Sequence, residues 1–216
     1  MSKAIVSLLG VAGLCAVASA DLQITEAFVG LDGEDGTADW FEVTWTGVGT
    51  FDTGTLWYDD DSADFGSAVQ LSSIILNSGD SAVFLIGGAG EIATFASVWG
   101  AGGNIGLATG GAGLGQSGDA VTLFDGGGTL VDAVNTVGDH TLSGSMVFTF
   151  QYDDAGVQSD SVLGVNGAYE SNQFFNDNLG VAGDMISIVG SPANLPTPGA
   201  LALLGLGGLT ATRRRR

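Results

Sequence analysis

Residues 114–132 read LGQSGDAVTLFDGGGTLVD, and this stretch gives the clearest indication of the fold class. It contains two short runs of apolar and β-branched residues, 120–124 and 129–134, on either side of the turn sequence at 125–128. Such runs with a period of two are typical of strands that bury one face. A Gly-rich turn between them is typical of a hairpin. The stretch therefore predicts an antiparallel β-hairpin.

Similar runs bounded by Gly, Asp and Asn recur on both sides of this hairpin. They lie at residues 22–25, 39–45, 55–58, 69–76, 82–86, 146–150 and 185–189. One helical pattern appears at 91–99, where Ile92, Phe95 and Trp99 are spaced three and four residues apart. It falls in a Gly-rich crossover that is long enough to connect two sheets. We expect an all-β antiparallel sandwich with one short crossover helix.

Four stretches resemble the lamin-tail domain family, which occurs in nuclear lamins and in many secreted bacterial proteins. They are LQITEA at 22–27, DWFEV at 39–43, GTLWYDD at 54–60, and LGQSGDAVTLFD at 114–125 followed by GTLVD at 128–132. The third departs from the family pattern, because Trp57 follows Leu56 instead of preceding it. The resemblance implies an immunoglobulin-like sandwich over residues 21–140 that acts as a binding or scaffolding module without catalytic residues. We expect 141–193 to be a β extension of the same domain.

The first 20 residues have the pattern of a secretory signal peptide. Lys3 precedes an apolar run, and Ala18-Ser19-Ala20 ends it. Cleavage by signal peptidase would leave Asp21 as the new N-terminus. The only cysteine, Cys15, would leave with this segment, so we expect an exported protein without disulfides.

The C-terminal segment 194–216 has three parts: a proline motif, an apolar run at 199–212 and a block of arginines. It resembles the PEP-CTERM sorting signal, although Thr replaces the usual Glu of the motif. The resemblance implies transient insertion in the inner membrane of a Gram-negative-type bacterium. It further implies processing by an exosortase and release to the cell surface or extracellular polysaccharide matrix. A weak single-span tail anchor is the alternative. The residues that carry the signal are Pro196, Thr197, Pro198, Arg213, Arg214, Arg215 and Arg216.

Charge is distributed unevenly along the chain. All 24 acidic residues lie between residues 21 and 184, and no Lys or Arg lies between residues 21 and 212. Nucleic-acid binding needs a basic surface, and attraction to anionic lipids needs one too. Nucleic-acid binding and attraction to anionic lipids are therefore excluded for the central part of the chain. P-loop, Schiff-base and arginine-clamp chemistry are excluded too, because they need Lys or Arg.

The densest acidic cluster is DDDSAD at 59–64. Calcium takes six to eight oxygen ligands, and closely spaced aspartates in a loop supply several. We therefore take Asp59, Asp61 and Asp64 as the candidate calcium ligands, with solvated loop acids as the alternative. Calcium or another counterion would also relieve the self-repulsion of a region without internal cations.

Other candidate chemistry is weaker. His140 is the only histidine, no G-x-S-x-G sequence accompanies it, and we interpret it as a loop residue. Residues 113–118 spell G-x-G-x-x-G, but a predicted strand follows where a dinucleotide site needs a helix. Trp40, Trp45 and Trp57 would suit a sugar cleft if exposed, although tryptophans on strands are more often core residues.

These patterns together predict a non-enzymatic structural or adhesive protein, with no cofactor apart from candidate calcium. The alternative is a secreted carbohydrate-active enzyme or a lectin-like module that uses surface carboxylates.

Overall fold

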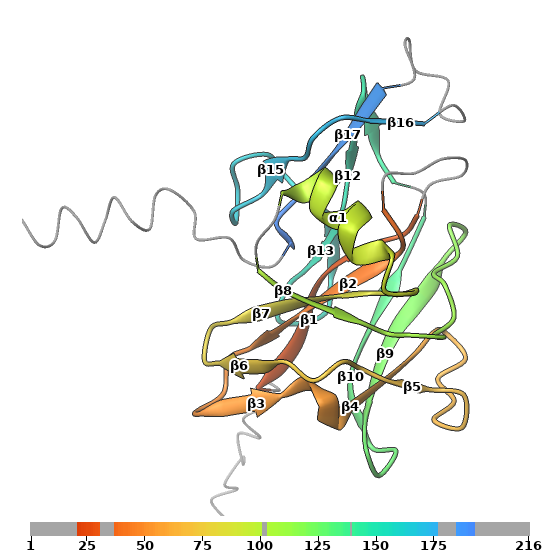
Figure 1. The fold of residues 1–216 in the computed structure, drawn as a ribbon, viewed down its shortest axis with the longest axis vertical. Coiled ribbons are helices and arrows are strands. Elements are labelled where there is room, and N and C mark those ends of the chain that lie inside the picture. Colours follow the sequence, from red (N-terminus) through yellow and green to blue (C-terminus); the bar gives the residue numbers. More distant parts are fainter. Residues whose placement is uncertain (1–20, 31–36, 101–102, 139, 177–184, 193–216) are drawn as a thin grey trace, which may run out of the picture.

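The computed structural model describes residues 21–30, 37–100, 103–138, 140–176 and 185–192 (Figure 1). The predicted signal peptide and sorting tail lie outside these residues. Its elements in chain order are β1 (Leu22–Phe28), β2 (Trp40–Trp45), β3 (Thr50–Asp52), the 3-10 turn η1 (Thr53–Thr55), β4 (Leu56–Asp59), β5 (Val69–Gln70), β6 (Ile75–Asn77), β7 (Ser81–Leu85), α1 (Glu91–Trp99), β8 (Asn104–Leu107), β9 (Asp119–Asp125), β10 (Leu130–Thr136), β11 (Leu142–Ser143), β12 (Met146–Phe148), β13 (Phe150–Tyr152), β14 (Gln158–Asp160), β15 (Tyr169–Glu170), β16 (Phe174–Phe175) and β17 (Met185–Gly190).

Two sheets form the sandwich. One has the order β14-β13-β1-β2-β7-β8 and the other has the order β10-β9-β4-β5, while β3 and β6 pair by themselves. Apolar side chains from both sheets meet between them, and Phe41, Tyr58, Phe84 and Leu123 are each fully buried there. Burial of this apolar surface is the main source of stability for such a fold. The prediction of an all-β sandwich with one helix is confirmed.

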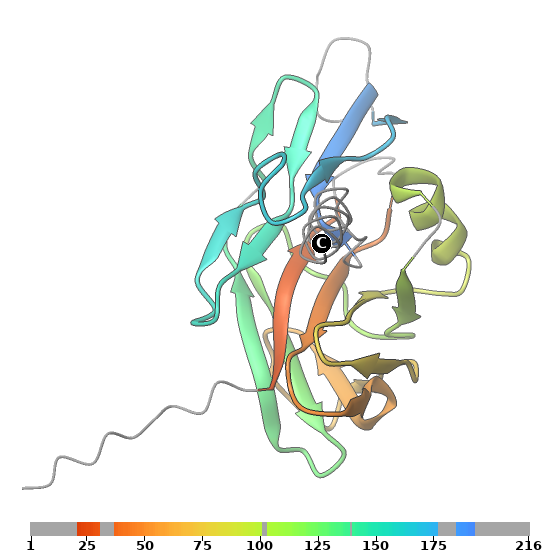
Figure 2. The same ribbon diagram turned by 90° about the vertical axis from the view of Figure 1, so that its left-hand side faces the viewer.

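The opposite face of the six-stranded sheet carries a second apolar cluster. Helix α1 and a sheet of order β11-β12-β17-β15 cover it, and Figure 2 shows α1 and the β9–β10 hairpin on opposite sides of β1 and β2. Trp40 lies edge-on to Phe95 and to Trp99 of α1, with ring-centroid distances of 5.9 and 6.1 Å. The helix residues Phe95, Val98 and Trp99 are buried, whereas Ile92 remains exposed. The residues between this face and α1 therefore form a second hydrophobic core.

The hairpin at 114–132 forms as predicted. Leu130 pairs with Phe124, and the Asp125 side chain accepts hydrogen bonds of 2.8 Å from the backbone N–H groups of Gly127 and Thr129. These donors lower the pKa of Asp125. Gly128 has a φ of +79°, a conformation that glycine adopts at low cost.

The structure departs from the predicted strands at two runs. The run at 69–76 is divided into β5 and β6, because Thr53 holds the intervening backbone through hydrogen bonds to the carbonyl oxygens of Ser72 and Ile74. The run at 146–150 is divided at Thr149, so that β12 pairs with β17 and β13 pairs with β1.

The sequence predicted an antiparallel sandwich, but two of the strand pairs are parallel. The pairs β7–β8 and β12–β17 are parallel. Parallel neighbours need a crossover connection, which α1 supplies between β7 and β8.

Strands β13 and β14 lie in the same sheet as β1, so residues 150–160 extend that sheet. The division of the chain at residue 140 stays a prediction. Among the described residues, no helix has the length and apolar character needed to cross a bilayer.

Candidate functional site

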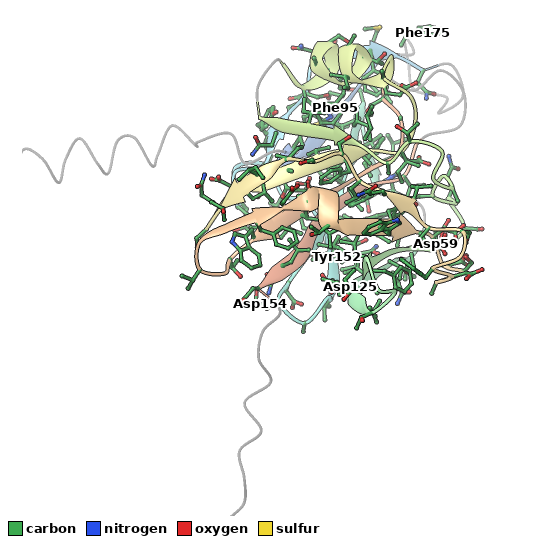
Figure 3. All side chains as sticks on the ribbon, turned by 60° about the horizontal axis from the view of Figure 1, so that its bottom comes forward. Asp59, Phe95, Asp125, Tyr152, Asp154 and Phe175 are labelled. Atoms are coloured by element: carbon green, nitrogen blue, oxygen red, sulfur yellow. The ribbon has the colours of Figure 1, made fainter. Side chains whose placement is uncertain are left out.

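The acidic loop after β4 is organised by Asp59, which is labelled in Figure 3. This residue is only 4% exposed. Its Oδ2 atom accepts hydrogen bonds from the Ser62 hydroxyl at 2.6 Å and the Asp64 backbone N–H at 2.7 Å, and the Ser67 hydroxyl donates to Oδ1 at 3.2 Å. Asp64 in turn accepts from the backbone N–H of Gly66. Asp59 and Asp64 therefore have roles within the loop.

A different set of three carboxylates converges beside this loop. One oxygen each from Asp60, Asp61 and Asp119 lies within 4.8 Å of the others. Asp119 begins β9, and its Oδ1 atom accepts a hydrogen bond of 3.1 Å from the backbone N–H of Asp61. This set could hold a cation such as calcium, because carboxylate oxygens are its preferred ligands.

Only Asp61 of the three predicted ligands, Asp59, Asp61 and Asp64, belongs to this set. Asp60 and Asp119 were not among the predicted ligands. Asp60 lies within the acidic run, whereas Asp119 is distant in sequence and reaches the loop only through the pairing of β4 with β9.

A polar cleft of about 280 Å³ lies on the helix-side face of the six-stranded sheet, beyond the apolar cluster. All of its lining residues carry a hydroxyl, amide or carboxyl group. The strand register explains this character, because Ser159, Gln151, Glu26 and Glu42 occupy one row across β14, β13, β1 and β2. The sequence patterns give no indication of this cleft.

On the side of the cleft formed by β1, β2 and β7, the polar groups form a chain of hydrogen bonds. The Thr25 hydroxyl donates to Glu42 Oε1 at 2.6 Å. The Thr25 and Thr44 hydroxyls are 3.0 Å apart, and those of Thr44 and Ser81 are 2.7 Å apart. Glu42 itself is 5% exposed.

The row continues to Glu26, which is 1% exposed. Both of its carboxylate oxygens accept hydrogen bonds from Ser191, whose backbone N–H and hydroxyl both donate, and Thr149 also donates to Glu26. Burial raises the pKa of Glu26, and these donors oppose that shift. Ser191 also accepts a hydrogen bond of 3.1 Å from Gln151 and lines the cleft.

His140 lies in the connection between β10 and β11, as predicted, but it is tightly held. Its ring stacks between Phe28 and Phe150, with centroid distances of 4.7 and 4.4 Å. Its two nitrogens lie 2.7 Å from the carbonyl oxygens of Val29 and Phe148. Burial lowers the pKa of His140, although these carbonyls oppose the shift. These contacts favour a structural role for the imidazole.

The three tryptophans do not share one exposed platform. Trp40 is fully buried. Trp45 is partly buried and stacks on Phe51 at 4.9 Å, and Trp57 is partly buried and meets Phe65 edge-on at 6.0 Å.

The G-x-G-x-x-G stretch at 113–118 is a loop that leads into β9. Its backbone N–H groups at Leu114 and Gly115 donate to the side chains of Asp39 and Asp119. They are therefore occupied by carboxylates of this chain, and a strand follows where phosphate binding would need a helix N-terminus.

No family model, curated protein or solved structure matches this chain.

Proposed function

We propose that the chain is the precursor of an exported, non-enzymatic protein of the cell surface or extracellular matrix. In this proposal, signal peptidase removes 1–20 and an exosortase processes the tail at 194–216. The mature product is an acidic sandwich of the immunoglobulin-like, lamin-tail type with a structural or adhesive role.

One observation carries the proposal: every basic residue lies within four residues of a terminus, and the all-β part between them contains only acidic charge. Basic flanks stay on the cytoplasmic side of a membrane during export. An acidic surface keeps a protein soluble and hydrated outside the cell. Divalent ions held between its carboxylates and those of anionic polymers would give it an adhesive function, and the Asp60, Asp61 and Asp119 set is the best place for such an ion.

The roles of the buried polar side chains favour binding over catalysis. A glycosidase needs two carboxylates that both reach the substrate. Glu42 and Asp153 line the cleft, but Glu42 accepts a hydrogen bond from Thr25, and Asp153 Oδ1 accepts two from the backbone of its own turn. Glu26, the cross-strand neighbour of Glu42, is bonded at both oxygens to Ser191. The only histidine is held between two aromatic rings.

The test is the intact mass and cellular fraction of the protein in its native host. We expect a surface or matrix product that begins at Asp21 and lacks the arginine block. Replacing Ala18 and Ala20 with leucine should block the first cleavage, since signal peptidase requires small residues there. Replacing Arg213 to Arg216 with alanine should block surface delivery without affecting the first cleavage. A cytoplasmic product that keeps both ends would refute the proposal.

A further inference from the structure

The polar cleft has a directional arrangement of hydrogen bonds. Because the Thr25 hydroxyl donates its only proton to Glu42, it must act as the acceptor toward Thr44. Thr44 must then accept from Ser81. All three hydroxyl protons are therefore directed toward Glu42, and the oxygens present lone pairs.

The other side of the cleft repeats this arrangement. Ser191 donates its hydroxyl proton to Glu26 Oε2 at 2.8 Å and accepts from Gln151. The hydroxyl protons of Thr25, Thr44, Ser81 and Ser191 are therefore used internally, and their oxygens act as acceptors. The cleft is also lined by groups that can donate, namely the Tyr152 and Ser159 hydroxyls and the Asn166 amide. A molecule that enters the cleft must therefore supply both donors and acceptors.

Charge narrows the class of ligand further. No Lys or Arg lies between residues 21 and 212, so nothing in the cleft would neutralise a phosphate, sulfate or uronate. The carboxylate of Asp153 already accepts two backbone hydrogen bonds of 2.9 Å in its own turn. Within the part of the chain that the structure describes, one set of three carboxylates lies close enough to share a metal ion. This set, Asp60, Asp61 and Asp119, lies outside the cleft.

We infer that this cleft binds a neutral sugar residue, whose hydroxyl groups donate to Glu42 and to the hydroxyl oxygens of Thr25, Thr44 and Ser191. The volume of about 280 Å³ lies just below the range of small-molecule sites, which begins at about 300 Å³. A cleft of this size suits a single sugar unit. This inference deepens the proposed function, on which it rests for the extracellular glycan that would supply the sugar.

The experiment is binding of the purified full chain to an array of neutral, amino and uronic-acid oligosaccharides, followed by calorimetric titration with the best neutral one. We expect neutral glycans to bind and uronic-acid glycans not to bind. Thr44→Val removes one acceptor at nearly constant volume and should raise Kd at least about tenfold, in the range of a hydrogen bond to a charged network. Thr50→Val, on exposed β3, is the matched control and should leave Kd unchanged.

A second variant guards against a folding defect in the first. Ser159→Ala alters an exposed residue on the other side of the cleft and should also weaken binding, with an unchanged melting temperature. Failure of all neutral glycans to bind, preference for uronic-acid glycans, or unchanged affinity in both cleft variants would each overturn the inference. Fractionation of the cell separates the two ideas, because binding by a protein that stays in the cytoplasm would refute only the proposed function.

Discussion

Replacing His140 with alanine should lower the free energy of unfolding by about 2–6 kcal/mol. The wild-type ring makes two aromatic contacts. In its neutral form it also makes two hydrogen bonds, because Nδ1 donates to the Phe148 carbonyl at 2.7 Å and Nε2 accepts from the Val29 backbone N–H at 3.1 Å. Aromatic pairs contribute about 0.5–1.5 kcal/mol each, and hydrogen bonds contribute a similar amount. For a chain of this size the loss corresponds to about 4–24 °C in Tm. Thermal unfolding followed by tryptophan fluorescence at pH 8 measures it.

Val137→Ala is the matched control, because Val137 lies in the same connection and is 67% exposed. Its effect should stay within about 0.5 kcal/mol, as for most surface changes. If His140→Ala is equally mild, the imidazole does not join β1 to β12 and β13, and the structural interpretation of His140 is wrong.

The same pair of proteins gives a pH dependence with a defined sign. Burial lowers the folded pKa of His140 below its ordinary value of 6.5. The stabilisation from the neutral ring is therefore complete above about pH 6.5 and is lost as the pH falls through the lowered folded pKa. The difference in stability between wild type and His140→Ala should shrink from pH 8 toward acid. A difference that grows instead would show that the folded ring is held as a cation.

Three further experiments, two of them with a matched control variant, test other parts of the fold. Asp59→Ala should lower the free energy of unfolding by about 1.5–3 kcal/mol, because the hydrogen bonds to its carboxylate are lost. Asp61→Ala should leave stability nearly unchanged but reduce any rise of Tm in millimolar calcium. Equal losses of stability in the two variants would contradict this. Gly128→Ala should cost about 1–2 kcal/mol by denaturant unfolding, because its φ is +79° and the new Cβ would lie 2.9 Å from Phe65; no loss would argue against this turn. Phe95→Ala should lower the free energy of unfolding by about 3–5 kcal/mol, because Phe95 is buried. Phe175, which like Phe95 is labelled in Figure 3, is 48% exposed, so Phe175→Ala should have only a small effect. Similar losses of stability in the two variants would refute the second core.

The sequence was sufficient for most strands and for α1, because alternation and helical spacing reflect local burial. It was insufficient for β8, whose run at 104–107 includes Gly106 and gains its pairing from β7. The two-residue strands β11, β15 and β16 are too short to carry a pattern. Their existence depends on partners elsewhere in the chain.

The cleft could not be predicted from the sequence pattern, because it depends on one β-bulge in β1. Strict alternation from Leu22 and Ile24 would place Glu26 on the core side between the two sheets. The register shift between Ile24 and Glu26 reverses this, so Ala27 joins Leu22 and Ile24 in that core and Glu26 moves to the opposite face. The backbone N–H of Ile24 donates to Asp132 of β10 at 2.7 Å, so the bulge also links the two sheets. A one-residue irregularity thus moves a carboxylate from one face of the sheet to the other.

The central part of the chain has acidic side chains but no Lys or Arg to pair with them, so backbone and hydroxyl donors take that role. Asp52 accepts from the Ser73 hydroxyl and the Gly54 backbone N–H, Asp80 accepts from the Asn77 backbone and side chain, and Asp125 accepts from its own turn. These bonds lower the pKa of all three aspartates. The stabilisation is therefore present above the ordinary pKa of about 3.9 and is lost as pH falls below it. Acid relieves the mutual repulsion of the carboxylates but releases the turns that they hold, so the two effects oppose each other. Added salt at neutral pH screens the repulsion and leaves these short-range bonds in place. We therefore expect added salt to raise Tm at neutral pH and acid not to raise it. If salt and acid stabilised the chain equally, the aspartates would not hold these turns through hydrogen bonds.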